Sequence, residues 1–221
     1  MQQDRKQKEP QLTTVRATRI LIMPVLGIVF GGIYWQFFIR ERLPSPYVLQ
    51  TSPESVIGSH LRFRGQPKSP VTLVEFGDYF CSACRSQDAK VASLLVRYPG
   101  RLRFTFRNLP LQANSTAPLL AESAGRQGYF WQMHDYLFQS PRPVSMQDVE
   151  PLLTSWHLDI KRFEKDCSSS AQSDVQEDIA AATQFKLSYT PTFLLCLPDN
   201  RVLWLYSIDQ AENYLGPKAN G

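Results

Sequence analysis

The chain has 221 residues, of which 43% are hydrophobic and 20% are charged, so we expect a sizeable buried core and exclude wholesale disorder. The formal net charge is +4. Part of it lies in residues 1–19, which carry five Lys or Arg against two acids. The remainder is close to neutral, which gives no electrostatic reason to expect a nucleic-acid partner.

Residues 20–39 (ILIMPVLGIVFGGIYWQFFI) carry no formal charge. A helix of that length spans a bilayer core of roughly 30 Å. Because more basic residues precede it than follow it, we predict a cytoplasmic tail at 1–19 and an extracytoplasmic, periplasmic domain behind an uncleaved anchor in the inner or plasma membrane. A cleaved signal peptide is the alternative, but the apolar stretch is long for one and no Ala-x-Ala-like site follows.

Three prolines among scattered polar residues predict that residues 40–58 form an extended tether. The folded domain is expected at 59–216, followed by a short tail at 217–221. Residues 61–64 alternate like an edge strand, whereas 71–76 form an almost continuous apolar run, typical of a strand buried on both faces.

A helix is predicted for residues 82–98, where Pro99-Gly100 ends it, and the next strand for 103–107. Strand, helix and strand at this spacing predict a parallel βαβ unit. A helical insertion follows at about 112–186, with helices at 115–127, 129–138, 145–156, 159–166 and 171–185.

Strand signal returns at residues 192–196 and 202–206, separated by the turn residues Pro198-Asp199-Asn200, which predicts a hairpin. A short helix near 210–215 closes the domain. The expected fold class is therefore α/β, with a mixed sheet and an inserted helical subdomain.

Cys81-Ser82-Ala83-Cys84 stands where the buried strand ends and the helix begins. Residues three apart share a helix face, so the two sulfurs can meet. Unpaired backbone N–H groups at a helix N-terminus favour a thiolate, which suits Cys81 to exchange with substrate. Cys84, one turn further in, is suited to resolve a mixed disulfide.

Other interpretations of the pair remain open on these residues alone. A disulfide closing so short a loop would add little stability. Half of a zinc site would need a second Cys-x-x-Cys or paired histidines, which the chain lacks. Copper could bind the dithiol with help from Met133 and His134, although His134 is more typical of packing.

Thr190-Pro191-Thr192 precedes the first strand of the hairpin. Proline cannot donate to a strand ladder, so Pro191 must begin the strand or lie at an edge. Its backbone could face the cysteines and hydrogen-bond a peptide, or it could simply start the strand.

These segments together resemble the DsbA-like branch of the thioredoxin superfamily, the DsbA and BdbD type. The resemblance rests on Gly65, on the run from Pro70 to Tyr79 followed by Cys81-x-x-Cys84, and on three later stretches that occur in the same order. Those stretches are Phe104–Leu111, Trp131–Phe138 and Thr190–Phe193. It extends over roughly residues 59–207.

The resemblance implies a thioredoxin fold with a helical insertion and a cis peptide bond between Thr190 and Pro191 facing the dithiol. It also implies that Glu75 is a buried acid that helps proton transfer at the buried thiol. A carboxylate at a strand end that simply reaches solvent is the alternative for Glu75.

The expected activity is protein thiol-disulfide exchange that forms disulfides in reduced or misoxidised exported proteins, with no cofactor beyond the Cys81–Cys84 disulfide and no metal. A membrane redox partner, often quinone-linked in this family, would reoxidise the pair. A disulfide reductase or isomerase of the same fold is the alternative, since direction depends on redox poise. From other classes, a tethered binding or assembly factor for an exported client and a metal carrier remain.

The sequence departs from the family at Ser82, where proline is frequent, and no histidine or other cation lies between the two cysteines. We therefore predict a less acidic Cys81 and a less oxidising couple than in a histidine-containing relative. Tyr189 is also bulkier than usual. Cys167 and Cys196 could pair, or could remain a helix-end thiol and a buried apolar residue. The basic stretch 85–107 predicts a solvated face or a contact with an anionic partner.

Overall fold

The computed structural model describes residues 43–60, 62–112 and 115–217. The chain divides into two units, residues 1–43 and 44–221, and every described helix and strand belongs to the second. The predicted cytoplasmic tail at 1–19 and membrane anchor at 20–39 lie outside the described residues. Among the residues that are described, no helix combines the length and apolar character needed to cross a bilayer.

A mixed six-stranded sheet forms the centre of the domain, in the order β1-β6-β5-β3-β4-β2. β3 and β4 are parallel and α3 (Ser82–Arg97) connects them, which confirms the predicted βαβ unit. β5 and β6 form the predicted antiparallel hairpin. The strands are β1 (Tyr47–Leu49), β2 (Arg64–Gly65), β3 (Val71–Gly77), β4 (Leu102–Asn108), β5 (Thr192–Cys196) and β6 (Val202–Leu205). The edge strand expected at 61–64 is thus reduced to β2.

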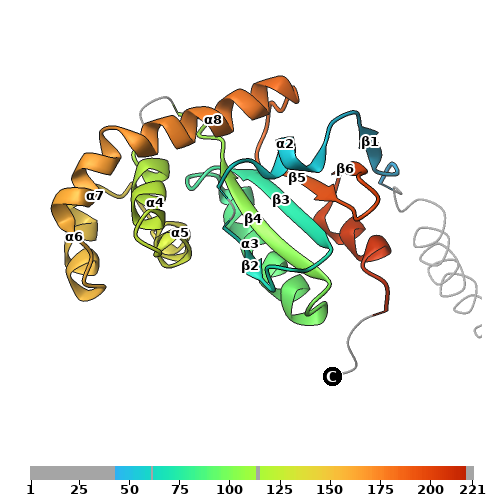
Figure 1. Ribbon diagram of the computed structural model, residues 1–221, viewed down its shortest axis with the longest axis horizontal. Coiled ribbons are helices and arrows are strands. Elements are labelled where there is room, and N and C mark those ends of the chain that lie inside the picture. Colours follow the sequence, from blue (N-terminus) through green and yellow to red (C-terminus); the bar gives the residue numbers. More distant parts are fainter. Residues whose placement is uncertain (1–42, 61, 113–114, 218–221) are drawn as a thin grey trace, which may run out of the picture. The chain divides into compact units, whose positions relative to one another are not determined.

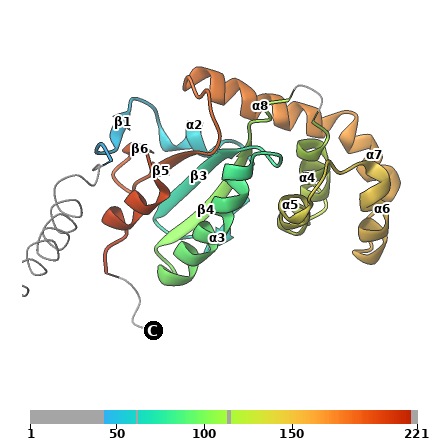
Figure 2. The ribbon, with the colours of Figure 1, turned by 180° about the vertical axis from the view of Figure 1, so that it is seen from behind.

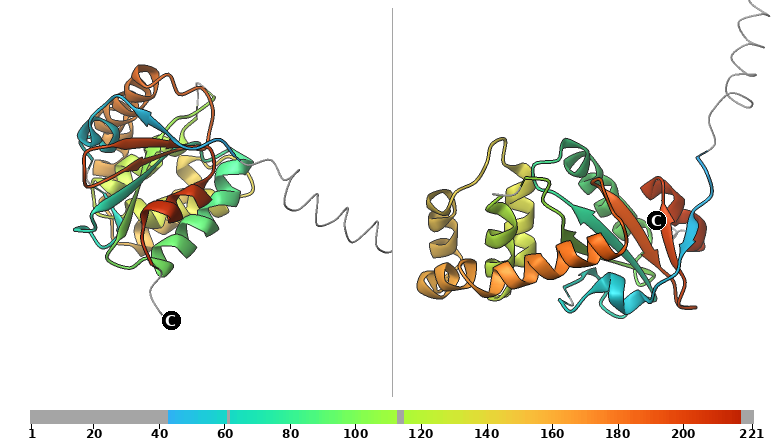
Figure 3. Two further views of the ribbon diagram at one scale, coloured as in Figure 1. Left: turned by 90° about the vertical axis from the view of Figure 1, so that its right-hand side faces the viewer. Right: turned by 90° about the horizontal axis from the view of Figure 1, so that it is seen from above.

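Both faces of the sheet are covered by helices. The view on the left of Figure 3 shows α2 (Pro53–Ile57) and α8 (Ser170–Gln184) on one face, with α3 and the 3-10 helix η2 (Ile208–Tyr214) on the other. Along β3, Leu73 joins one core cluster, while Val74 and Phe76 join the other. The side chains point alternately to the two faces, so β3 is buried on both sides, as its apolar run predicted.

The helical insertion lies beyond one end of the sheet, and α8 leads from it back toward β5 (Figures 1 and 2). All five predicted helices are confirmed, with ends shifted by only one or two residues. No strand interrupts the described residues between 115 and 185. The helices before α8 are α4 (Ala117–Gly125), α5 (Phe130–Gln139), α6 (Met146–Ser155) and α7 (Ile160–Cys167).

The prediction of an extended tether at 40–58 is wrong for residues 47–57. β1 pairs antiparallel with β6, and the Ser52 side chain caps α2 by accepting from the Ser55 amide. Pro53 stands in the first turn of α2, where a missing N–H costs nothing. Prolines therefore did not exclude structure here, and β1 depends on pairing with a strand about 150 residues later, which local sequence does not reveal.

The expectation of a solvated basic face at 85–107 is wrong for Arg107. Its side chain is buried, and its Nε lies 2.6 Å from Asp178 Oδ1 on α8. Its Nη1 donates to the carbonyl oxygens of Ser55 and Val56, at 3.1 and 3.2 Å. Arg107 therefore ties β4 to both helices on that face of the sheet.

Candidate functional site

Cys81 and Cys84 lie at the junction between β3 and α3. Cys81 is the N-cap residue of α3, and its Sγ accepts from the Cys84 amide at 3.5 Å. Asp78 fixes the preceding turn by accepting from the amides of Phe80 and Leu111, each at 2.8 Å. Cys81 is partly exposed, whereas Cys84 has an exposed fraction of 0%. Of these two cysteines, only Cys81 can be reached by an incoming sulfur atom.

The surroundings of Cys81 favour its thiolate. Partial burial opposes ionisation, but hydrogen bonding by the Thr190 side chain and by the amides of Cys84 and Ala83 outweighs it and lowers the pKa of the Cys81 thiol. The Thr190 Oγ1 is buried, and among the described residues it has no hydrogen-bond partner other than the Cys81 sulfur. It is therefore free to donate to a sulfur anion.

Cys84 has the opposite environment. Burial, reinforced by the nearby charge of Glu75, raises the pKa of the Cys84 thiol far above its ordinary value. The pair is thus asymmetric: one accessible thiol that ionises easily, and one buried thiol that keeps its proton.

Glu75 lies on β3 with an exposed fraction of 1%, so it does not reach solvent as a strand-end carboxylate would. Burial raises the pKa of Glu75 well above its ordinary value, and the Asp88 carboxylate adds to that effect. A hydrogen bond with Cys84 acts in the other direction. Glu75 Oε1 has no other partner among the described residues. The structure therefore places an acid with a raised pKa next to the buried thiol.

The Thr190–Pro191 peptide bond is cis, as the family resemblance implied. The Cys81 Sγ donates to the Thr190 carbonyl oxygen at 3.4 Å, so this loop faces the cysteine pair directly. Pro191 immediately precedes β5, where its missing N–H takes nothing from the ladder.

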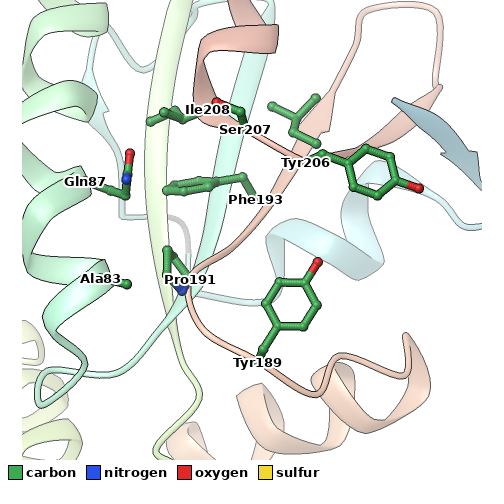
Figure 4. A pocket seen from close by; sticks show the side chains of 9 residues that line it. Ala83, Gln87, Tyr189, Pro191, Phe193, Tyr206, Ser207 and Ile208 are labelled. Carbon is green, nitrogen blue, oxygen red and sulfur yellow. The ribbon is translucent and has the colours of Figure 1, made fainter. Parts of the chain in front are cut away.

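A cavity of about 190 Å³ opens between α3 and the Thr190–Pro191 loop (Figure 4). Ala83 and Gln87 of α3 border one side, while Pro191 and Phe193 border the other. The remaining described residues that line it are Tyr189, Leu205, Tyr206, Ser207 and Ile208, so none of its described lining residues carries a charge.

The other two cysteines lie away from this site and are unpaired. Cys167, at the end of α7, packs against one core cluster, and its Sγ lies 3.1 Å from Ser123 Oγ. Cys196, on β5, is buried in the other cluster. Burial raises the pKa of both thiols, to about 12 for Cys196. Both are packing residues in this structure, one of the two alternatives that the sequence left open.

His134 is buried among aromatic rings, and its Nδ1 lies 3.2 Å from the Tyr79 hydroxyl. This is the packing environment that the sequence suggested. Within the described residues, no group of three or more Cys, His, Asp or Glu side chains is arranged to hold a metal ion. At the cysteine pair, a metal ion would therefore find the two sulfur atoms but no complete set of three such ligands among the described residues.

The family model described as thioredoxin matches residues 59–203, about two thirds of the chain. The chain belongs to the thioredoxin family. This thioredoxin-family domain resembles the crystal structure of a thioredoxin-like oxidoreductase from Silicibacter pomeroyi, with a TM-score of 0.63 and 22% identity, over 75% of this chain and 96% of the other. It also resembles Pseudomonas aeruginosa DsbA2, with a TM-score of 0.59 and 21% identity, over 79% and 95%. Its fold is therefore that of the DsbA-like thiol-disulfide oxidoreductases.

The sequence of this chain is also similar to part of a larger protein. The Na⁺/H⁺ antiporter NhaA 1 of Salinispora arenicola is 33% identical over 137 residues, which make up 60% of this chain and 21% of the antiporter. The chain thus spans about a fifth of the length of that relative. The antiport activity in the name is that of the relative.

Sequence reasoning placed Cys81, Cys84, Glu75, Thr190 and Pro191, and the structure brings all five together. It singled out Tyr189 as bulkier than usual but missed the Thr190 hydroxyl and Tyr206, which also lines the cavity. Nothing in the local sequence marks these two, because the position of each depends on residues far away in the chain.

Proposed function

We propose that this thioredoxin-family chain is an extracytoplasmic protein thiol-disulfide oxidoreductase that forms disulfides in exported proteins. The observation that carries the proposal is the asymmetry of the pair. Cys81 is accessible and has a lowered pKa, whereas Cys84 is buried and has a raised one. A structural disulfide needs no such difference, but successive exchange steps do.

In the first step, the thiolate of a substrate cysteine attacks Cys81 Sγ of the oxidised pair. The Cys81–Cys84 bond breaks, and its electron pair goes to Cys84 Sγ. Burial raises the pKa values of both groups, so Glu75, which hydrogen-bonds with Cys84, is placed to give a proton to this sulfur as the sulfur leaves. The Thr190 hydroxyl and the amides at the start of α3 then favour Cys81 as the next leaving group.

In the second step, another thiolate of the substrate attacks the substrate sulfur of the mixed disulfide. Cys81 leaves as a thiolate, the substrate has lost two electrons, and the pair has gained them. A membrane redox partner, such as a quinone-linked oxidase, then removes the two electrons and restores the disulfide. The pair itself is the only redox group that this cycle requires of the chain.

Position in the cell is part of the same proposal. The uncharged segment 20–39 would anchor the chain, and the basic residues before it favour an exported domain. Disulfides persist outside the cytoplasm, so this placement suits the oxidising direction. A reductase or isomerase acting in the same compartment is the second candidate, because the site would serve either direction.

Trapping of substrates tests the proposal. Full-length chain with Cys84→Ser cannot resolve mixed disulfides, so we expect exported proteins to be captured on Cys81 and released by dithiothreitol. Cys81→Ser is the matched control, since it removes the accessible sulfur and leaves the fold of the site intact. Equal capture by both variants, or none by Cys84→Ser, would contradict the proposal and favour a binding or assembly factor.

A further inference from the structure

Three large exposed side chains gather where β1 forms one edge of the sheet (Figure 1), and we call Tyr47, Val48 and Tyr206 together the edge surface. Tyr47 and Val48 belong to β1, and Tyr206 directly follows β6. Their exposed fractions are 42%, 45% and 46%. The ring centroids of Tyr47 and Tyr206 lie 6.4 Å apart. A group of exposed apolar side chains on one surface commonly marks a binding site.

The edge surface is packed against the sheet on one side and open on the other. The Tyr47 ring stacks on Trp204, with centroids 5.5 Å apart and an interplanar angle of 25°. Val48 pairs in register with Leu203, which belongs to the other core cluster, so Tyr47 and Val48 point to opposite faces of the sheet. Among the described strands, β1 has a partner on one side only. An edge that is apolar on both faces but has an open backbone suits a layer that is partly apolar and partly wet.

The topology of the sheet brings the edge surface to the same end as the cysteine pair. β5 is antiparallel to both β3 and β6, so β6 runs in the direction of β3, and β1 runs the opposite way. The start of β1 and the end of β6 therefore lie at the end of the sheet where β3 leads to Cys81. β1 is three strand spacings from β3, or about 14 Å. A partner that binds the edge surface thus comes close to the redox pair.

The chain reaches the edge surface soon after the uncharged segment 20–39. The Pro44 carbonyl oxygen accepts from the Gln210 side chain of η2 at 2.8 Å, which fixes the chain to the domain at that residue. Pro44 comes five residues after Ile39, and five extended residues span at most about 18 Å. With 20–39 as the proposed anchor, Pro44 stays within that distance of the hydrocarbon core. The layer of lipid headgroups is then within reach of Tyr47.

We propose that the edge surface binds the headgroup interface of the bilayer that anchors the chain, and so holds the cysteine pair near the membrane. Tyrosine suits this layer because its ring is apolar while its hydroxyl stays hydrated. The open backbone of β1 excludes the hydrocarbon core but not the headgroup layer, which contains water. The redox partner proposed above lies in the membrane, so docking keeps the pair within its reach. This inference rests on the proposed membrane location and adds an interaction surface.

Spin labelling of the full-length chain in nanodiscs of phosphatidylethanolamine and phosphatidylglycerol tests the proposal. A nitroxide is attached to Val48→Cys in a Cys81→Ser, Cys84→Ser background, and the background alone corrects for labelling of the packed cysteines. Oxygen concentrates in the bilayer, whereas a nickel chelate stays in water. The ratio of relaxation by oxygen to relaxation by the chelate should be several-fold higher than for Val96→Cys. Val96 is the matched control because it is an exposed valine near the far end of α3.

Two further variants separate docking from simple tethering. Tyr47→Ser, Tyr206→Ser should lower the ratio at Val48→Cys to that of the control, because it removes the rings and leaves the tether unchanged. A long Gly/Ser spacer inserted after Arg42 should leave the ratio high, because affinity for lipid rather than the length of the tether holds the surface in place. A high ratio after loss of both rings, or one that falls to the control value with the spacer, overturns the proposal.

The remaining outcomes also decide the question. Equal ratios for Val48→Cys and Val96→Cys overturn the proposal, and a label on Tyr206→Cys repeats the comparison if Val48→Cys does not fold. A ratio that is high only in discs holding two copies would assign the surface to a second copy and overturn it too. Release of the chain from membranes by alkaline carbonate would instead contradict the anchor, and with it the proposed location of the enzyme.

Discussion

At the scale of single residues, the site depends on how differently two cysteines three positions apart are solvated. Cys81 has an open side toward solvent and several hydrogen-bond donors for an anion. Cys84 faces Glu75 in the core. The same spacing on an exposed helix would give two similar thiols, so the environment, rather than the motif, creates the division of labour.

This difference predicts selective alkylation of the reduced protein. With iodoacetamide at neutral pH, we expect Cys81 to be modified while Cys84 stays intact, because only the thiolate reacts. The rate of alkylation at Cys81 should rise with pH. Its midpoint should lie below the pKa of an ordinary thiol, which is about 8.5. Peptide mass mapping of the time course measures both. Faster modification of Cys84 would contradict the assigned roles.

The raised pKa of Glu75 predicts how stability depends on pH. In the folded state Glu75 binds its proton more tightly than in the unfolded state, which stabilises the fold at low pH. This contribution is lost as the pH rises from about 4.3, the ordinary pKa, toward the folded pKa. We therefore expect the free energy of unfolding of the native chain to fall over that window relative to Glu75→Gln, which cannot ionise.

Urea unfolding of the reduced proteins at several pH values measures this difference. Glu177→Gln is the control, because the Glu177 side chain is partly exposed. Hydrogen bonds from Ser59, together with His60 and Arg107, lower the pKa of Glu177 against the penalty of partial burial. Its replacement should change stability with pH in the opposite direction. Parallel curves for Glu75→Gln and the native chain would show that Glu75 ionises normally.

At the scale of helices and strands, periodicity predicted most of what the structure contains. The apolar run of β3, the helix after Cys81 and the five helices of the insertion follow from local pattern, because each buries a face that its own sequence defines. β1 and α2 do not, because three-residue β1 is held by its partner β6 and short α2 by Arg107. The Cys-x-x-Cys is visible in sequence for a similar local reason, whereas the cavity beside it is lined by segments that are far apart in the chain.

The buried pair Arg107–Asp178 should be the strongest polar link between these elements. Asp178→Ala removes the buried carboxylate partner of Arg107, leaving the partly exposed Glu177 carboxylate at 3.6 Å, and also removes the acceptor of the Asn108 amide. Loss of one partner of such a pair costs about 3–5 kcal/mol. Asp199→Ala removes the exposed partner of Arg201 and is expected to change stability far less. Chemical unfolding compares them, and equal losses would contradict the role given to Arg107.

At the scale of the whole chain, the location of the domain decides which thiols it meets. We expect a membrane-impermeant maleimide to label Cys81 of the Cys84→Ser variant in intact spheroplasts. A cysteine introduced by Gln2→Cys into a Cys81→Ser, Cys84→Ser background should react only after lysis, because residues 1–19 are predicted to be cytoplasmic. The reverse pattern would invert the orientation.

The central claim is that Cys81 and Cys84 act as one reversible redox couple. Equilibration of the full-length chain in glutathione buffers of known potential, followed by acid quenching, alkylation and mass analysis, tests it most directly. We predict a single two-electron transition to a Cys81–Cys84 disulfide, at a potential more reducing than the value of about −120 mV known for DsbA. Independent oxidation of the two thiols, or no disulfide between them at any potential, would contradict the account.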